Sequence, residues 1–167
     1  MKIVTVVGAR PQFIKAALVS EEIKKYPKRI KEILVHTGQH YDYGMSQKIF
    51  EDAGLREPDY HLKVKENLPP EQIAGMVQSL QKVLHKEKPD TVLVYGDTNS
   101  TLAGALAASL FGIPLVHVEA GLRSYDNRMP EERNRVLTDH LSRILFCPTE
   151  TAVENLRKEN ITKGVYQ

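Results

Sequence analysis

Short apolar runs alternate with amphipathic stretches along the whole chain. Five runs end in glycine or polar clusters, at residues 3–7, 33–36, 91–95, 115–118 and 144–146. Runs of this length, rich in Val, Ile and Leu, are typical of strands that are buried on both faces of a sheet. Because helical patterns separate them, the sequence predicts an α/β fold with a parallel sheet and right-handed crossovers.

The intervening segments predict helices, several of which begin at proline. We expect helices over 11–25, 43–53, 70–86, 101–111, 130–142 and 149–159. In the first helix, Ile14, Leu18 and Ile23 are expected to face inward. The Thr151–Glu154 spacing predicts a capping box for the last helix. Residues 55–68 show no clear pattern and are expected to be irregular.

Composition limits the classes of protein to which the chain can belong. With 167 residues, 41% hydrophobic and 26% charged, it fits one globular domain. A net charge of +2 without a long basic run gives no support to a nucleic-acid arm. The single cysteine, Cys147, is expected to be a small buried hydrophobe. No apolar stretch suits a signal peptide or a membrane span, so the cytoplasm is the expected compartment.

The candidate chemistry follows the first four predicted strands, where glycine stands beside ionisable or amide side chains. These exits hold Gly8, Arg10 and Pro11; Gly38, Gln39 and His40; Gly96, Asp97 and Thr98; and Glu119, Gly121 and Arg123. In an open parallel sheet, ligands bind outside the carboxyl ends of the strands. The opposite strand ends carry ordinary surface residues, so we expect the functional site at the carboxyl edge.

Two carboxylates, Asp97 and Glu119, follow successive strands. If these strands are neighbours, both groups open into one cleft and can divide acid and base roles. For Asp97, capping of the helix that begins near Thr98 is an equally good interpretation. For Glu119 that alternative is weaker, since no helix start follows it. Glu131 reads locally as a first-turn acid paired with Arg135, and Glu132 competes with it for any special role.

Two cations near the first strand exit favour an anionic ligand, and the missing nucleotide-binding motifs disfavour a redox cofactor. Arg10 and Lys15 lie at the start of the first helix, where a phosphate is favoured. No G-x-G-x-x-G or P-loop motif is present, so NAD and ATP are disfavoured. His36, His40 and His117 lie near strand ends, but no metal-binding spacing appears. We expect no metal site, and a structural or hydrogen-bonding role for each of these histidines.

The strand exits, taken together, resemble one enzyme family. The motifs are Val-Gly-Ala-Arg-Pro-Gln-Phe-Ile-Lys (7–15), Thr-Gly-Gln-His (37–40), Tyr-Gly-Asp-Thr-Asn-Ser-Thr (95–101), His-Val-Glu-Ala-Gly-Leu-Arg-Ser (117–124), Met-Pro-Glu-Glu-Arg-Asn-Arg (129–135) and Pro-Thr-Glu-Thr (148–151). In this order they resemble the UDP-N-acetylglucosamine 2-epimerases. Thr-Gly-Gln-His, with Asp42 and Met45 nearby, is more similar to the non-hydrolysing branch than to the hydrolysing one.

The resemblance implies a Rossmann-like three-layer domain, the N-terminal half of a two-domain glycosyltransferase-B-like fold. It implies interconversion of UDP-GlcNAc and UDP-ManNAc, by elimination of UDP and its re-addition with the opposite C2 configuration. The family's acid/base carboxylates map onto Asp97, Glu119 and Glu131, which selects Glu131 over Glu132. Its nucleotide-sugar contacts map onto Arg10 and Lys15, together with Asp97 and Glu119. No cofactor is required.

The resemblance also implies a missing partner. The family's second domain supplies most nucleotide contacts and a further active-site histidine, so residues 1–167 alone are expected to have little or no activity. A hydrolysing epimerase that releases N-acetylmannosamine and UDP, or a non-catalytic nucleotide-sugar-binding remnant, remain the alternatives. A homodimer is compatible with the family. Gln39 and His40 are expected to contact either the substrate or an effector.

Overall fold

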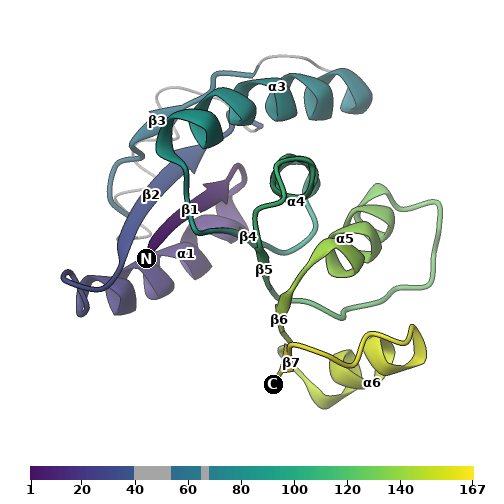
Figure 1. Cartoon of the computed structure of the whole chain (residues 1–167). Coiled ribbons are helices and arrows are strands. Elements are labelled where there is room, and N and C mark those ends of the chain that lie inside the picture. The colour runs from purple at the N-terminus through teal and green to yellow at the C-terminus, as the bar shows by residue number, and fades with distance from the viewer. Residues whose placement is uncertain (40–53, 65–67) are drawn as a thin grey trace.

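The computed structural model describes residues 1–39, 54–64 and 68–167, which form one parallel sheet flanked by helices (Figure 1). The strand order in this part of the chain is β3-β2-β1-β4-β5-β6-β7. The strands are β1 (Lys2–Val7), β2 (Lys31–His36), β3 (Tyr60–His61), β4 (Thr91–Tyr95), β5 (Leu115–Val118), β6 (Ile144–Phe146) and β7 (Val165–Tyr166). The helices are α1 (Arg10–Lys24), α3 (Pro69–Glu87), α4 (Asn99–Leu110), α5 (Pro130–Leu141) and α6 (Glu150–Lys158).

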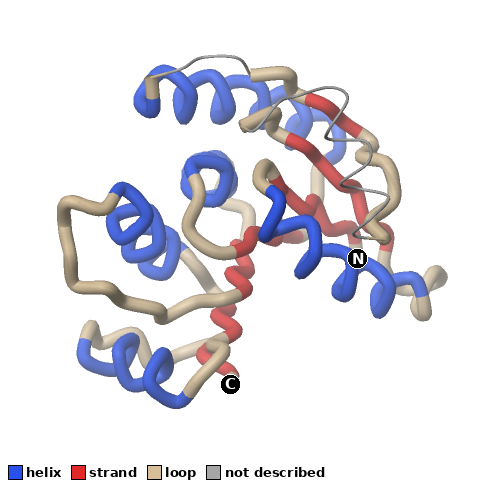
Figure 2. The backbone as a smooth tube through the Cα atoms, turned by 180° about the vertical axis from the view of Figure 1, so that it is seen from behind, coloured by secondary structure: helices blue, strands red, loops and turns tan. Residues whose placement is uncertain are grey.

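The central strands are buried on both faces, and this explains their continuous apolar runs. On one face Val4 and Val6 of β1 pack with residues of α3 and α4 such as Met76 and Ala103. On the other face Ile3 and Val7 of the same strand pack with Phe13, Ala16 and Ala17 of α1. The expected three-layer, Rossmann-like α/β architecture is therefore confirmed, and Figure 2 shows the strands between the two layers.

All five predicted strands are present, but residues 55–68 are not wholly irregular. Tyr60 and His61 pair in parallel with Val35 and His36, which adds a short edge strand beside β2. A strand of two residues is too short to show an alternating pattern in the sequence. It forms because its backbone pairs with β2, not because of local propensity. The helix expected over 43–53 lies outside the described residues.

The expected inward face of α1 was wrong for Ile14 and Leu18, whereas Ile23 is partly buried and packs against the core as predicted. Ile14 is 53% exposed and Leu18 is 73% exposed, whereas Phe13, Ala16, Ala17 and Ser20 are buried. The buried residues have the same helical spacing, but most are small, so the helix axis can approach the sheet closely. Hydropathy alone favoured the larger side chains.

The last helix begins at a different cap from the one expected. Thr149 is the N-cap residue of α6, and its hydroxyl accepts a hydrogen bond from the Ala152 amide at 3.2 Å. Thr151 lies inside the helix, so the Thr151–Glu154 spacing does not form the capping box. Thr149, two residues earlier in the chain, also offers a hydroxyl that can accept from a free amide at the helix start. The sequence spacing could not decide which of the two threonines is the cap.

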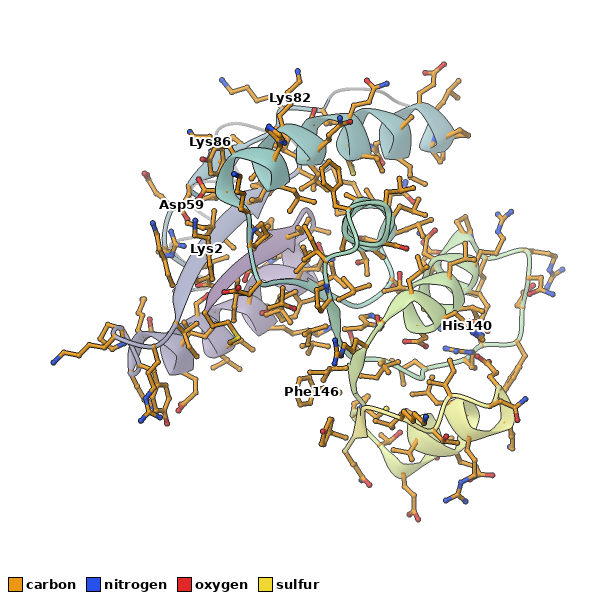
Figure 3. All side chains as sticks on the ribbon, viewed as in Figure 1. Lys2, Asp59, Lys82, Lys86, His140 and Phe146 are labelled. Atoms are coloured by element: carbon orange, nitrogen blue, oxygen red, sulfur yellow. The ribbon has the colours of Figure 1, made fainter. Side chains whose placement is uncertain are left out.

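Leu18 borders an apolar groove of about 760 Å³ on the α1 face of the sheet. Val116 and Val118 of β5 and Phe146 of β6 also line it. Figure 3 shows Phe146 projecting from β6 on this side, where its side chain is 45% exposed. None of the strand-exit residues that the structure describes lines the groove, which is therefore separate from the candidate site.

Candidate active site

The candidate site lies at the carboxyl edge of the sheet, around its topological switch point. Connections run from β1 outward to β2 on one side and from β4 outward to β5 on the other, so the direction reverses between β1 and β4. Ligands of open α/β sheets bind at such a point. The exits of β1 and β4, at Gly8 and Gly96, therefore flank the position where a ligand is expected.

A buried glutamine ties these two exits together. The side-chain oxygen of Gln12 accepts hydrogen bonds from the Gly8 and Ala9 amides at 2.7 and 3.0 Å. Its nitrogen donates to the Tyr95 carbonyl at 2.7 Å and to the hydroxyl of Thr101 at 2.9 Å. Sequence reasoning did not single out Gln12. Its place at the third helical position, where Gln reaches back to the cap backbone, was the available signal.

Arg10 is the first residue of α1, and its side chain is exposed. Lys15 lies further along the same helix, where it is partly buried and forms an ion pair with Glu119. Only Arg10 thus stands at the helix start, and Lys15 is directed to the β5 exit. The two cations expected to bind an anion together are placed on α1 beside two different strand exits.

The β2 exit meets the start of α4. Thr37 and Ser100 share a hydroxyl–hydroxyl hydrogen bond of 2.7 Å. The side-chain oxygen of Gln39 accepts from the Ser100 amide at 2.9 Å and from its hydroxyl at 2.7 Å. Gln39 therefore satisfies a first-turn donor of α4. His40 lies outside the described residues.

Asp97 does not cap α4, so that interpretation was wrong. The N-cap residue is Thr98, whose hydroxyl accepts from the Thr101 amide at 3.3 Å. The Asp97 carboxylate forms an ion pair with Arg135 of α5 instead, and its side chain is 31% exposed. Asn134 of α5 donates to the Asp97 carbonyl at 3.0 Å. The carboxylate is thus held at the rim of the sheet and remains accessible to a ligand.

Glu119 follows β5, which is the hydrogen-bonded neighbour of β4, so the two carboxylates follow adjacent strands as predicted. Its backbone is left-handed, with φ of +74°, an uncommon conformation outside glycine. The Phe146 carbonyl holds the turn by accepting from the Glu119 and Ala120 amides, each at 3.0 Å. The Glu119 side chain is 28% exposed and pairs with Lys15. Backbone strain at an accessible carboxylate is typical of functional sites.

The adjacent acids Glu131 and Glu132 differ sharply in environment. Glu131, at the second position of α5, is exposed. Glu132 is 3% exposed, and its carboxylate accepts from the Ser124 and Tyr125 amides at 2.9 Å each. Burial opposes ionisation of Glu132, but these hydrogen bonds outweigh it and lower its pKa. Glu132 thus anchors the loop before α5, whereas Glu131 is available to a ligand.

Arg135 does not pair with Glu131 in the i,i+4 manner expected locally. Its guanidinium bridges the Asp97 carboxylate and Glu132, the latter at 3.1 Å. Arg135 thereby links a strand exit to the loop held by Glu132.

Two further sequence expectations concern Cys147 and metal ions. Cys147 is buried, and this burial raises the pKa of its thiol to about 11, as suits a small core residue. Across residues 1–39, 54–64 and 68–167, His, Cys, Asp and Glu side chains form no group of three that could hold a metal ion. In the same described part of the chain, none of the helices has both the length and the apolarity to span a bilayer.

These features define a Rossmann-like α/β domain with accessible carboxylates beside its switch point, two of which, Asp97 and Glu119, are paired with a cation. A family model described as UDP-N-acetylglucosamine 2-epimerase matches residues 21–167. The chain belongs to this family, and the resemblance seen in its motifs is confirmed.

Curated relatives and solved structures agree with this assignment. The chain is 55% identical over 166 residues to a UDP-N-acetylglucosamine 2-epimerase homolog of Methanococcus maripaludis, covering 99% of this chain and 46% of the relative. It is 53% identical to the UDP-2,3-diacetamido-2,3-dideoxy-D-glucuronate 2-epimerase of Pseudomonas aeruginosa, covering 98% of this chain and 46% of the relative. The Methanocaldococcus jannaschii UDP-GlcNAc 2-epimerase, solved in complex with UDP-GlcNAc and UDP, superposes with a TM-score of 0.92 at 46% identity over 99% of this chain and 46% of that one.

The chain thus spans about half the length of the relatives it matches. A more distant likeness, to MurG of Acinetobacter baumannii at 16% identity and a TM-score of 0.62, concerns the fold alone. Again under half of the longer chain is covered.

Proposed function

We propose that this chain forms one half of the active-site cleft of a nucleotide-sugar 2-epimerase that interconverts UDP-GlcNAc and UDP-ManNAc. The observation that carries the proposal is the pair Asp97 and Glu119, which follow neighbouring strands beside the switch point. Each remains accessible and each has a cation at hand. The names of its relatives, which act at C2 of UDP-linked amino sugars, support the same reaction.

The reaction needs one group to remove the C2 proton and another to return a proton on the opposite face. In the elimination, the base takes the C2 proton, a C1–C2 double bond forms, and the C1–O bond breaks to release UDP. Re-addition of UDP to the 2-acetamidoglucal reverses these changes with the opposite C2 configuration. Asp97, Glu119 and Glu131 are the proposed acid and base groups, because all three carboxylates are accessible.

Arg10 and Lys15 are the proposed contacts for the diphosphate. The Lys15 ammonium is paired with Glu119 in this structure, and in a complex it could bind a phosphate of the ligand instead. The exposed Arg10 side chain at the start of α1 adds a second cation near the amide donors of that helix. Binding of an anionic ligand by Lys15 would therefore weaken the ion pair that this lysine makes with the Glu119 carboxylate.

A second half of the protein is part of this proposal. We expect residues 1–167 to be the N-terminal Rossmann-like domain, facing a C-terminal nucleotide-binding domain across the cleft. The relatives' length, about twice that of this chain, supports it. Accordingly, we expect residues 1–167 alone to show little or no turnover.

A second substrate is favoured by the 53% identity to an enzyme named for UDP-2,3-diacetamido-2,3-dideoxy-D-glucuronate. The chemistry at C2 is the same, but that sugar carries a second acetamido group and a carboxylate. Offering both substrates to a two-domain form, with UDP release followed in parallel, separates the two specificities. Net release of UDP with free N-acetylmannosamine would indicate the hydrolysing reaction instead.

The decisive experiment measures deuterium incorporation at C2 of UDP-GlcNAc in D₂O by a two-domain form of the protein. We expect Asp97→Asn, Glu119→Gln and Glu131→Gln each to slow exchange or epimerisation by about 10²-fold or more, as for loss of an acid or base group. Glu154→Gln, which removes an exposed carboxylate of α6, is the matched control and should leave the rate unchanged. Full activity in all three variants would refute these roles, and binding without exchange in the unmodified protein would favour the non-catalytic alternative.

A further inference from the structure

A fully buried histidine lies directly beneath the candidate site. The His117 ring is inaccessible to solvent, and so is its partner Asp139 of α5. Its Nδ1 lies 2.7 Å from the Asp139 carboxylate and its Nε2 lies 2.7 Å from the Gly96 carbonyl oxygen. Since a carbonyl oxygen only accepts, Nε2 carries a hydrogen, and a second hydrogen lies between Nδ1 and the carboxylate.

This ring ties the β4 exit to β5. His117 belongs to β5, and the carbonyl that it holds belongs to Gly96, the residue before Asp97. The Gly96 amide in turn donates to the Val118 carbonyl at 2.9 Å. Both polar groups of the Gly96 backbone are therefore bonded to β5, so the turn carrying Asp97 is fixed against the strand that ends at Glu119.

The histidine is itself held by a buried charge network. Asp139 also accepts from the Gly121 amide at 3.1 Å and from Arg123 at 2.7 Å. Arg123 is 1% exposed and makes a bidentate pair with Glu159, with both contacts at 2.7 Å. The network joins α5, the loop after β5 and the end of α6 (Figure 1). A removed member would leave a buried charge without its partner, so the geometry is strongly specified.

An Asp–His pair near a carboxylate site suggests a catalytic dyad, but the contacts argue otherwise. Both ring nitrogens are occupied by protein acceptors, and the side chain has no exposed surface. No substrate atom can reach it without rearrangement of the strand exits. The ring can act on the reaction only through the backbone that it holds.

We propose that His117, oriented by Asp139, is a positioning residue that sets the placement of Asp97 relative to Glu119. The proposal rests on the proposed function for its catalytic consequence, but the clamp itself can be tested without turnover. A shift of about 1 Å in a reacting group is enough to cost about 10²-fold in rate. A buried clamp on the backbone between the two carboxylates can therefore contribute strongly to catalysis without touching substrate.

The first test uses NMR on residues 1–167. We expect His117→Gln to increase hydrogen exchange at the Gly96 amide by about tenfold relative to core amides such as that of Val94, because one buried hydrogen bond is lost or weakened. The side-chain carboxyl signals of Asp97 and Glu119 should shift in the same variant. The control, Asn155→Ala, removes a buried hydrogen bond to the nearby Gly121 carbonyl without touching Gly96, and should leave these signals in place.

His117→Phe keeps a planar ring and loses both hydrogen bonds, so it should show a larger local effect than His117→Gln. If His117→Phe does not fold, His117→Gln alone decides the matter. Uniformly faster exchange at all amides with unshifted carboxyl signals would overturn the proposal in favour of a purely structural histidine.

The second test measures turnover in the two-domain form. His117→Gln should lower kcat by about tenfold to 10²-fold with KM nearly unchanged, since orientation rather than binding is lost. Asn155→Ala should keep kcat. An unchanged kcat in His117→Gln would overturn the catalytic consequence. If the unmodified two-domain form has no epimerase activity, the proposed function fails, and the NMR result still decides whether the clamp exists.

Discussion

At the scale of single residues, Gly96 and Glu119 occupy left-handed backbone at neighbouring strand ends, with φ of +62° and +74°. A Cβ atom built on Gly96 would lie 3.1 Å from the Glu119 carboxylate oxygen Oε2. Glycine at this position therefore serves two purposes, since it permits the turn and leaves room for the candidate catalytic group.

We expect Gly96→Ala to destabilise the fold by about 1–2 kcal/mol, the cost of a left-handed residue with a Cβ, and also to displace the Glu119 carboxylate. Gly112→Ala is the matched control, because Gly112 has φ of +65° and no heavy atom within 4 Å of the added Cβ. Both variants should lose similar stability in denaturant unfolding. Only Gly96→Ala should weaken turnover in a two-domain form, and equal turnover in the two would show that the Glu119 contact is unimportant.

His36 offers a pH-dependent prediction. Burial, and secondarily the charge of His61, lower the pKa of His36 from 6.5 to about 4 in the fold. The unfolded chain therefore binds this proton first as pH falls, so folding stability is fully present above pH 6.5 and is lost between about 6.5 and 4. The full effect is about 3 kcal/mol.

Denaturant unfolding at pH 7, 5.5 and 4 would measure this loss. In His36→Phe the part of the slope due to His36 should disappear, while in His140→Gln, where the histidine is 49% exposed, the slope should persist. A slope in His36→Phe as steep as that of the unmodified chain would contradict the assignment to His36.

The candidate site could be predicted from the sequence wherever a residue's place follows from strand order. Asp97 and Glu119 come directly after buried strands, so their meeting at one edge required only that β4 and β5 be neighbours. The distinction between Glu131 and Glu132 could not be derived locally. It depends on which carboxylate the Ser124–Tyr125 loop folds onto, and this is a tertiary contact.

At the scale of elements, propensity predicted the existence of helices better than their faces or caps. In α1 two helical stripes compete, and hydropathy chose Ile14 and Leu18 over the smaller Ala16 and Ala17 that the sheet accommodates. The sequence could not show that the surface beside Leu18 would be exposed in the part of the chain that the structure describes. Nor could it show β3, whose two residues depend on pairing with β2.

The cap of α6 yields a prediction at this scale. Thr149→Ala should lower the free energy of unfolding by about 1 kcal/mol, because it removes the side-chain acceptor for the Ala152 amide. Thr151→Ala is the matched control, and it should change stability by less than about 0.5 kcal/mol, since that residue is exposed inside the helix. Chemical denaturation of the two variants side by side measures the difference. A larger loss of stability for Thr151→Ala than for Thr149→Ala would show that Thr151 is the cap, as the sequence spacing predicted.

At the scale of the whole molecule, the helices in the described part of the chain are unevenly distributed over the two faces of the sheet, since α3 and α4 pack on one face and α1 on the other. Residues of β5 and β6 on the α1 face line the apolar groove beside Leu18, and the Phe146 and Tyr166 rings contact each other at a tilt, with ring centres 5.8 Å apart. A large exposed apolar surface marks a site of contact with another protein segment, a membrane or a ligand. Because the relatives are about twice as long, the proposed second half is the natural source of that contact.

Dye binding can test whether the groove is covered in a two-domain form. Residues 1–167 should bind an apolar dye such as ANS at the groove. Leu18→Ser or Phe146→Ser should remove most of the fluorescence, and Leu18→Ser should cost less stability, since Leu18 is 73% exposed and Phe146 is 45% exposed. Leu137→Ser, at a leucine of α5 that is 50% exposed and does not line the groove, is the control and should keep the signal. A two-domain form should bind the dye weakly if its second half covers the groove. Strong dye binding in both forms would instead mean that this face stays open and that the second half contacts the chain elsewhere, across the strand exits alone.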